Sequence, residues 1–248
     1  MIKISTAVRL LMLVLLIVFI SAPQMFAPLF KPLAENDGPA IYTQTSLLSL
    51  TLSHLTLVAL ATVASTLLSV GLAILVTRPF GAEFLPVSRA FANVGQTFPP
   101  VAVLALAVPI FGFGPTPTLI ALFLYGLLPI FENALAGLTE LPPNVSDAAK
   151  GAGMTQLQRL VQVELPLALP LILTGIRVSV VISLSTATIG STVAARTLGE
   201  VIIAGLLSNN SAFILQGGLV VAVLALLIHD GFVAIETAVL RRRVPSSP

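Results

Sequence analysis

The chain has 248 residues, of which 56% are hydrophobic and only 9% carry a charged side chain, and its formal net charge is +2. An ordinary soluble domain carries about 25% charged residues. Too few charges remain here to cover a globule in water, so we predict a polytopic membrane protein. The sequence contains no cysteine, which excludes disulfides and thiolate metal sites.

Runs of apolar residues predict six membrane crossings, because a crossing needs about 20 mostly apolar residues. The first has the basic flank of a signal peptide, but its continuation makes it long enough to span, and we interpret it as an uncleaved crossing. The third and fourth are expected to be broken at Pro99-Pro100, at Pro109 and at the FGFGPTPT loop, since a proline frees a backbone carbonyl. The predicted crossings are 8–28, 50–76, 86–110, 116–135, 168–192 and 212–236.

The distribution of lysine and arginine predicts the orientation of these crossings. If the N-terminus is cytoplasmic, Lys31 and Arg196 fall on the outer side, and the rest of the 12 basic residues fall on the inner side. This asymmetry agrees with the positive-inside rule. Both termini are therefore predicted to be cytoplasmic, together with the connection between the fourth and fifth crossings.

That connection contains the stretch SDAAKGAGMTQLQRLVQVELP (146–166), which is more polar than the sequence around it. It predicts two short helices that are joined by a glycine elbow and end at Leu165-Pro166. Helices of this length are not stable alone in water, so they need a partner surface, either lipid headgroups or a protein groove. A headgroup-bound helix favours a basic polar face, whereas the polar face here is rich in glutamine, which favours the protein groove.

Capping residues predict where these two helices begin. Asn144 or Ser146 can cap the first helix, which would place Asp147 in its first turn. Thr155 and Gln158 form a capping-box pair that is expected to start the second helix.

The same stretch resembles the "EAA" signature of the permease subunits of bacterial ATP-binding-cassette (ABC) importers. The spacings all agree, and the single departure is an aspartate where that family has glutamate. The matching residues are Asp147-Ala148-Ala149, Gly153 and Val163-x-Leu165-Pro166. Longer stretches at 96–114, 149–177 and 186–206 are similar to the branch that imports osmoprotectants such as glycine betaine, choline, carnitine and proline betaine.

The resemblance implies an all-α, type I ABC importer permease fold with about six transmembrane helices in the bacterial inner membrane. It implies an N-terminal helix and periplasmic loop at 1–42, a permease domain at 43–240 with a cytoplasmic coupling loop at 140–167, and a cytoplasmic tail at 241–248. In that family the loop docks into a cleft of a separate ATPase. The candidate coupling residues are Asp147, Ala148, Ala149, Gly153, Leu157, Leu165 and Pro166.

The chain is predicted to be a non-catalytic transport subunit. None of its lysines stands in Gly-Lys-Ser/Thr, so it lacks the loop that cradles the phosphates of ATP. We predict no catalytic, cofactor or metal site in this chain, and ATP and Mg are expected to bind the partner ATPase. The resemblance also implies a second permease (an identical or a sister chain), a periplasmic substrate-binding protein and membrane lipid as partners, and no nucleic acid.

Uncharged polar side chains near the proline break and along the fifth crossing indicate a weakly polar translocation path. Small hydroxylated residues also serve tight helix packing in membranes, and that alternative stays open. The candidate path residues are Asn93, Gln96, Thr97, Thr186, Thr188, Ser191 and Thr192.

Two further features concern the outer side. The chain has no tryptophan and two tyrosines, whereas capture of quaternary ammonium favours aromatic cages. High-affinity selection is therefore expected in the separate periplasmic binding protein. The apolar segment 197–210 is too short to cross, and we interpret it as a re-entrant or periplasmic surface helix.

Other functions stay open at this point. An ion-coupled secondary transporter would need carboxylates at mid-membrane, whereas Glu132, Asp230 and Glu236 are predicted near the inner face. An intramembrane enzyme would need a nucleophile paired with a base, and His54 has no evident partner in the sequence. A non-transporting scaffold, and a permease for another small solute such as an amino acid, also fit the composition.

Overall fold

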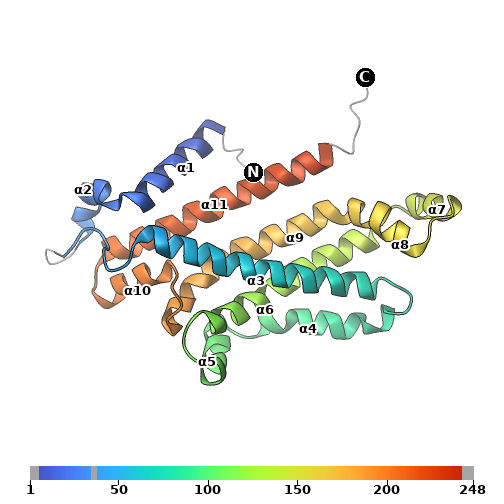
Figure 1. The fold of residues 1–248 in the computed structure, drawn as a ribbon, viewed down its shortest axis with the longest axis horizontal. Coiled ribbons are helices and arrows are strands. Elements are labelled where there is room, and N and C mark those ends of the chain that lie inside the picture. Colours follow the sequence, from blue (N-terminus) through green and yellow to red (C-terminus); the bar gives the residue numbers. More distant parts are fainter. Residues whose placement is uncertain (1–5, 35–37, 242–248) are drawn as a thin grey trace. The chain divides into compact units, whose positions relative to one another are not determined.

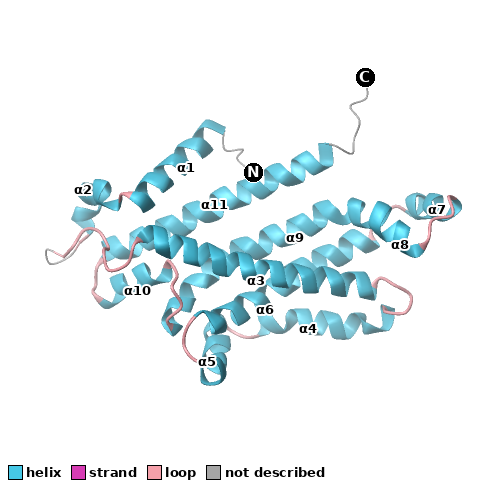
Figure 2. Ribbon diagram, viewed as in Figure 1, coloured by secondary structure: helices cyan, strands magenta, loops and turns pink. Residues whose placement is uncertain are grey.

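The computed structural model describes residues 6–34 and 38–241, and within these ranges the chain is helical and contains no strand (Figure 2). This confirms the predicted all-α fold. The predicted tail beyond Arg241 lies outside the described residues. The chain divides into two compact units. Unit 1 comprises Met1–Leu60, Pro99–Leu122 and Ser183–His229, and unit 2 comprises Ala61–Phe98, Phe123–Ile182 and Asp230–Pro248.

Four helices are long and apolar enough to cross a membrane, and they confirm the second, fourth, fifth and sixth predicted crossings. Two further helix pairs reach this length only as bent spans, so the described residues hold four crossings, or six if each bent pair is counted. The four (Figure 1) are α3 (Leu47–Val76), α6 (Pro115–Thr139), the run Gln156–Val193 that contains α9 (Leu165–Thr186), and α11 (Ser211–Arg241).

The first predicted crossing, 8–28, is not one straight helix. α1 (Thr6–Ser21) has 16 residues, and the helical stretch Pro23–Leu33 bends away from it by 109°. The residue before a proline is disfavoured in the helical conformation, and Ala22 accordingly has φ −136° and ψ 60°. The bent stretch consists of η1 (Pro23–Phe26), α2 (Ala27–Phe30) and η2 (Lys31–Leu33).

The third predicted crossing, 86–110, is broken at the proline pair, as predicted. Phe98 and Pro99 are both extended, with ψ angles of 139° and 142°. They separate two helices and so end the first of them before it can cross a membrane. The elements on either side are η3 (Ala82–Phe84), α4 (Leu85–Thr97) and α5 (Pro100–Phe111).

Pro109 does not break its helix, which corrects that part of the prediction. It lies inside α5, near the end of the helix, where a missing N–H removes a single helical hydrogen bond. The chain leaves the helix only at the glycines of the following loop, as predicted. Gly112 and Gly114 there have φ angles of 78° and 127°, a backbone region that favours glycine.

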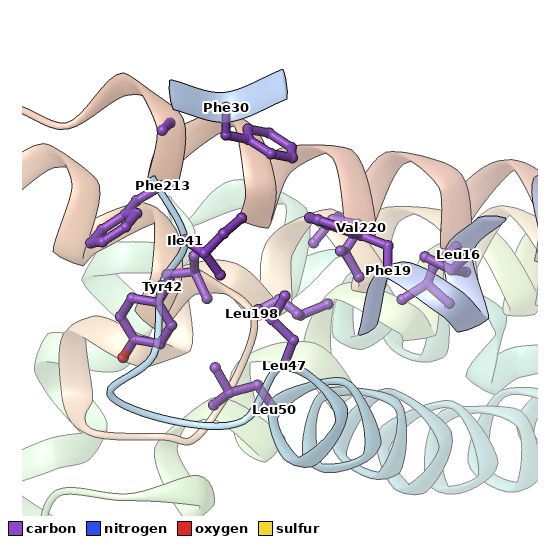
Figure 3. Close-up of a cluster of buried hydrophobic side chains, with 14 residues drawn as sticks. Leu16, Phe19, Phe30, Ile41, Tyr42, Leu47, Leu50, Leu198, Phe213 and Val220 are labelled. Carbon is purple, nitrogen blue, oxygen red and sulfur yellow. The ribbon is translucent and has the colours of Figure 1, made fainter. Parts of the chain in front are cut away.

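Unit 1 has a hydrophobic core to which α1, α2, the segment before α3, the start of α3, α10 (Gly199–Leu207) and α11 all contribute (Figure 3). Phe19 packs edge-on against Phe26 and stacks on Phe30, with ring-centroid distances of 5.1 and 5.5 Å. Leu50 and Leu198 are fully buried in this core. Burial of these apolar side chains holds α10 against α11 and orders the segment around residue 42.

In unit 2, α3, α6 and α9 approach one another through small residues. A side chain at Gly126 would meet Ser65 Oγ at 2.7 Å and Ser179 Oγ at 2.8 Å. Ser65 Oγ donates a 2.8 Å hydrogen bond to the Phe123 carbonyl. Small residues and hydroxyls at helix contacts are typical of packing in membranes, so these serines serve helix packing here.

Candidate functional site

The polar connection forms two short helices, α7 (Pro143–Gly151) and α8 (Gln156–Arg159), which pack together in unit 2 (Figure 1). This confirms the predicted pair of helices with an elbow between them. We call residues 143–164 the coupling segment. It lies between α6 and α9 in the chain.

α7 begins earlier than the capping residues predict. Its N-cap is Pro142, its first residue is Pro143, and no side chain caps it, so the predicted caps Asn144 and Ser146 are wrong. Proline suits the first helical position because its φ is already helical and its missing N–H would have no partner there. Asp147 therefore lies beyond the first turn.

The residues of the predicted signature divide between the surface and the interior of α7. Asp147 and Lys150 are exposed and form an ion pair with an N–O distance of 3.3 Å. An exposed pair of this kind contributes little to stability. Ala148 is exposed, whereas Ala149 is buried. One face of α7 therefore packs against the rest of unit 2, and the face with the ion pair is exposed.

The elbow depends on a glycine, as predicted. Gly153 has φ 75°, a left-handed conformation that costs a residue with a side chain about 1–2 kcal/mol. Its N–H donates to the Lys150 carbonyl at 2.9 Å, and the Met154 N–H donates to the Ala149 carbonyl at 3.2 Å. These bonds satisfy the last carbonyls of α7 and redirect the chain into α8.

The predicted capping box is also present. Thr155 Oγ1 accepts from the Gln158 N–H at 3.3 Å, and Gln158 Oε1 accepts from the Thr155 N–H at 2.9 Å. The two residues satisfy each other's backbone donors. The start of α8 is thereby fixed by local sequence alone.

The second helix does not end at Leu165-Pro166, which corrects the prediction. Residues 160–164 form one π-helical turn (η4), in which the Leu165 N–H donates to the Leu160 carbonyl, and the helix continues as α9. Proline lacks an N–H and its ring crowds the carbonyl four residues earlier. A widened turn at this point lets Pro166 enter the helix without a break, so the coupling segment runs directly into the fifth crossing.

A buried ion triad anchors the coupling segment, and sequence reasoning missed it. Glu164 accepts from Arg78 Nη2 at 2.5 Å and from Arg159 Nε at 2.9 Å. The side chains of Glu164 and Arg78 are 11% and 10% exposed. Arg78 follows the end of α3, 86 positions from Glu164 in the chain, so no local pattern could reveal the contact. The triad ties the coupling segment to the end of α3.

Two apolar side chains of the coupling segment remain in solvent. Leu157 is 69% exposed and Val161 is 55% exposed, and they stand four residues apart, so they share one helix face. Leu165 and Pro166 are partly buried. The pair forms a small apolar surface that the described residues leave uncovered.

In unit 2, the structure places three candidate path residues on α4, where all three are exposed. Gln96 Nε2 donates to the Tyr125 carbonyl at 3.2 Å, and the Thr97 hydroxyl donates to the Val94 carbonyl at 2.8 Å. Gln96 therefore links α4 to α6, whereas Thr97 is satisfied within its own helix. The residues are Asn93, Gln96 and Thr97.

In unit 1, the other four candidates lie at the end of α9 and in the 3₁₀ turn η5 (Ala187–Val193). Thr188 and Thr192 each donate at 2.7 Å to the carbonyl three residues earlier. Ser191 Oγ and Thr197 Oγ1 lie 2.7 Å apart and share a hydrogen bond. Thr186 is partly buried. Most of these hydroxyls are engaged by the chain itself, and their role in a path stays a prediction.

Two of the three carboxylates considered for ion coupling, Glu132 and Glu236, are paired with arginines in unit 2. Arg89 Nε lies 2.6 Å from Glu132 Oε1, and Arg177 Nε lies 2.9 Å from Glu236 Oε1. Ion-coupled transport uses ionisable groups along an ion pathway. A glutamate held by arginine is already neutralised, which weakens that alternative.

His54 is fully buried in unit 1 and is engaged by the backbone. Its Nε2 lies 3.0 Å from the Leu184 carbonyl, and its Nδ1 lies 3.4 Å from the Leu198 nitrogen. Both ring nitrogens thus contact backbone groups of unit 1. Within residues 6–34 and 38–241, no cluster of three His, Cys, Asp or Glu side chains could hold a metal ion.

A family model matches residues 69–244 of the chain, which is more than half of its length. The family is described as "Binding-protein-dependent transport system inner membrane component".

Individual proteins of this kind are similar over most of the chain. The osmoprotectant import permease protein OsmY of Salmonella typhimurium is 42% identical over 185 residues, covering 75% of this chain and 78% of that protein. The choline transport system permease protein OpuBB of Bacillus subtilis is 35% identical over 197 residues, covering 79% of this chain and 86% of that protein.

Solved structures share the fold at lower identity. A chain of the MetNI methionine ABC transporter, in an inward facing conformation, has a TM-score of 0.70 at 20% identity and covers 78% of this chain and 95% of its own length. A chain of an amino acid ABC transporter has a TM-score of 0.62 at 18% identity, with coverages of 91% and 98%. The chain therefore belongs to the family of binding-protein-dependent transport system inner membrane components, as a multi-pass inner-membrane permease with the ABC transporter permease fold.

Proposed function

We propose that this chain moves osmoprotectants such as glycine betaine or choline across the inner membrane, as the permease subunit of an ATP-driven importer. The observation that supports this substrate class is the 42% identity to an osmoprotectant import permease over three quarters of the chain. The solved amino acid transporters are similar at 20% identity or less, so they support the fold and not their own substrates.

In this proposal, the energy for transport comes from a separate ATPase that binds the coupling segment. Several features support it: the rigid elbow at Gly153, the exposed Leu157 and Val161, and the anchoring of the segment by Glu164. The predicted excess of basic residues on one side supports a cytoplasmic position for the segment. ATP and Mg bind the ATPase, and a second permease, identical or sister, completes the pathway.

Uptake into proteoliposomes tests the proposal. The chain is reconstituted with its ATPase, its second permease and its substrate-binding protein, and labelled betaine, choline, carnitine, proline betaine and methionine are compared. We expect ATP-dependent uptake of at least one osmoprotectant and none of methionine. Uptake of methionine alone would refute the substrate class, and uptake driven by an ion gradient without ATP would refute the ATPase coupling.

Replacing Gly153 by alanine is expected to impair coupling without a steric clash. No atom lies within 4 Å of the added methyl, so the effect is that of the left-handed φ of 75°. A cost of about 1–2 kcal/mol would lower the population of the elbow conformation roughly 5- to 30-fold. Substrate-stimulated ATPase activity measures the effect.

Gly151→Ala is the matched control, because an added methyl there also meets nothing within 4 Å and no left-handed φ is involved. It should leave the stimulation near the level of the unaltered protein. Equal stimulation in both variants would show that the elbow conformation does not matter for coupling.

A further inference from the structure

Unit 1 contains a polar pocket whose lining includes none of the residues of the coupling segment and none of the candidate path residues. It has a volume of about 680 Å³ and lies between the segment at 38–44, α10 and the start of α11. Its polar lining includes Tyr42, Gln44, Glu200, Ser208 and Asn210. Among the described residues that line the pocket, Glu200 carries the only carboxylate and none is basic.

The Glu200 carboxylate is held in place through one of its two oxygens. Tyr42 Oη donates to Oε1 at 2.8 Å, and Thr45 Oγ1 donates to the same oxygen at 2.5 Å. Oε2 accepts no hydrogen bond from any described residue, and Glu200 remains partly exposed. The pocket therefore presents a fixed, negatively charged oxygen with free acceptor capacity.

The wall around Glu200 is itself fixed by contacts with α11. Tyr42 is 2% exposed, its N–H donates to Gln216 Oε1 at 3.1 Å, and its ring packs edge-on against Phe213 at 5.4 Å (Figure 3). Burial, and then the hydrogen bond to Glu200, raise the pKa of the Tyr42 phenol, so the phenol stays protonated and remains a donor. A rigid site loses little freedom when a ligand binds.

The lining decides which cation fits. A quaternary ammonium has no N–H and relies on open aromatic faces, but the Tyr42 and Phe213 rings are 2% and 6% exposed and pack on each other. A primary ammonium or a guanidinium instead donates N–H bonds to a carboxylate oxygen such as Oε2. The pocket is therefore suited to a basic amino-acid side chain and not to choline or betaine.

We propose that this pocket binds a lysine or arginine side chain of the substrate-binding protein when it docks on the permease. The inference rests on the proposed function, because the importer must receive its substrate from such a protein. It accounts for an acidic pocket beside α10, a short helix that the sequence predicts to lie on the outer side as a re-entrant or periplasmic surface helix.

The test uses Glu200→Gln, which retains an oxygen for Tyr42 and Thr45 and removes the charge. The complete transporter is reconstituted, and its ATPase stimulation is measured against the concentration of the binding protein. We expect the KM for the binding protein to rise at least about tenfold and the kcat at saturation to change little. Glu83→Gln, an exposed acid of unit 2, is the matched control and should leave both unchanged.

A second variant, Ser208→Lys, places a competing cation in the pocket lining and should raise the same KM even if Glu200→Gln folds poorly. An unchanged KM in both variants, or a loss confined to kcat, would overturn the proposal. Free arginine distinguishes a further outcome. If it raises the melting temperature of the unaltered transporter but not that of Glu200→Gln, and the KM for the binding protein is unchanged, the pocket binds a small solute instead. The ATPase assay does not depend on which solute is carried. An unchanged KM would therefore overturn the proposal for the pocket and would leave the proposed substrate class, which the uptake experiment tests, unaffected.

Discussion

Replacing Glu164 by alanine is expected to destabilise the protein more than any other single removal of a charge in unit 2. The substitution leaves Arg78 and Arg159, whose side chains are 10% and 18% exposed, without their shared carboxylate. Breaking a buried ion pair by removing one partner costs about 3–5 kcal/mol. We expect a clear fall in the melting temperature in detergent and a loss of ATPase stimulation.

Glu132→Ala is the matched control, because it also removes one carboxylate from an arginine in unit 2. Glu132 and Arg89 are 38% and 52% exposed, and exposed pairs contribute at most about 1 kcal/mol. If the two variants melt at the same temperature, the triad does not anchor the segment. Glu164→Gln, which keeps the shape of the side chain, should lie between the two.

Replacing Leu157 by aspartate is expected to detach the ATPase while the permease stays folded. Leu157 is 69% exposed, so the change costs the isolated permease little. A leucine that a partner buries contributes about 1.5–3 kcal/mol, and a carboxylate in its place also has to lose its water. The affinity for the ATPase should fall by roughly tenfold to a hundredfold or more, measured by co-purification and by ATPase stimulation.

Gln156→Asp introduces the same charge one residue earlier, on a different face of α8, and should retain the ATPase. If Leu157→Asp co-purifies with the ATPase as fully as Gln156→Asp does, the exposed apolar face is not the docking surface. A fall in the melting temperature of Leu157→Asp alone would show instead that Leu157 supports the fold.

The sequence predicts those parts of the molecule that depend on neighbouring residues. The Thr155–Gln158 capping box, the left-handed Gly153 and the break at Pro99 each follow from a few adjacent side chains, and all are present. The four long crossings follow from apolar length alone.

Apart from the two predicted caps of α7, the errors concern prolines whose effect on a helix depends on the residues packed around them. Pro109 and Pro166 stand inside helical runs that the sequence predicts to be interrupted, whereas Pro23 ends a helix that it predicts to continue. In a membrane the surrounding helices decide whether a freed carbonyl is tolerated, and this information is not local.

The features that matter most to the two proposals join residues far apart in the chain. Arg78 meets Glu164 across 86 positions, and Tyr42 meets Glu200 across 158. A single sequence shows the charges but not which of them meet, so neither the triad nor the pocket could be predicted from it.

The ion pair of Asp147 with Lys150 has a consequence for how the coupling segment associates. The pair carries no net charge. Glu164 forms ion pairs with two arginines whose side chains are largely buried. The exposed part of the segment therefore offers a partner the apolar side chains of Leu157 and Val161 beside uncharged polar ones such as Gln156 and Gln162, and little net charge. Because salt screens only exposed charges, ionic strength should have little influence on the affinity of the ATPase for the coupling segment. Cooling weakens hydrophobic contacts, so it should lower that affinity.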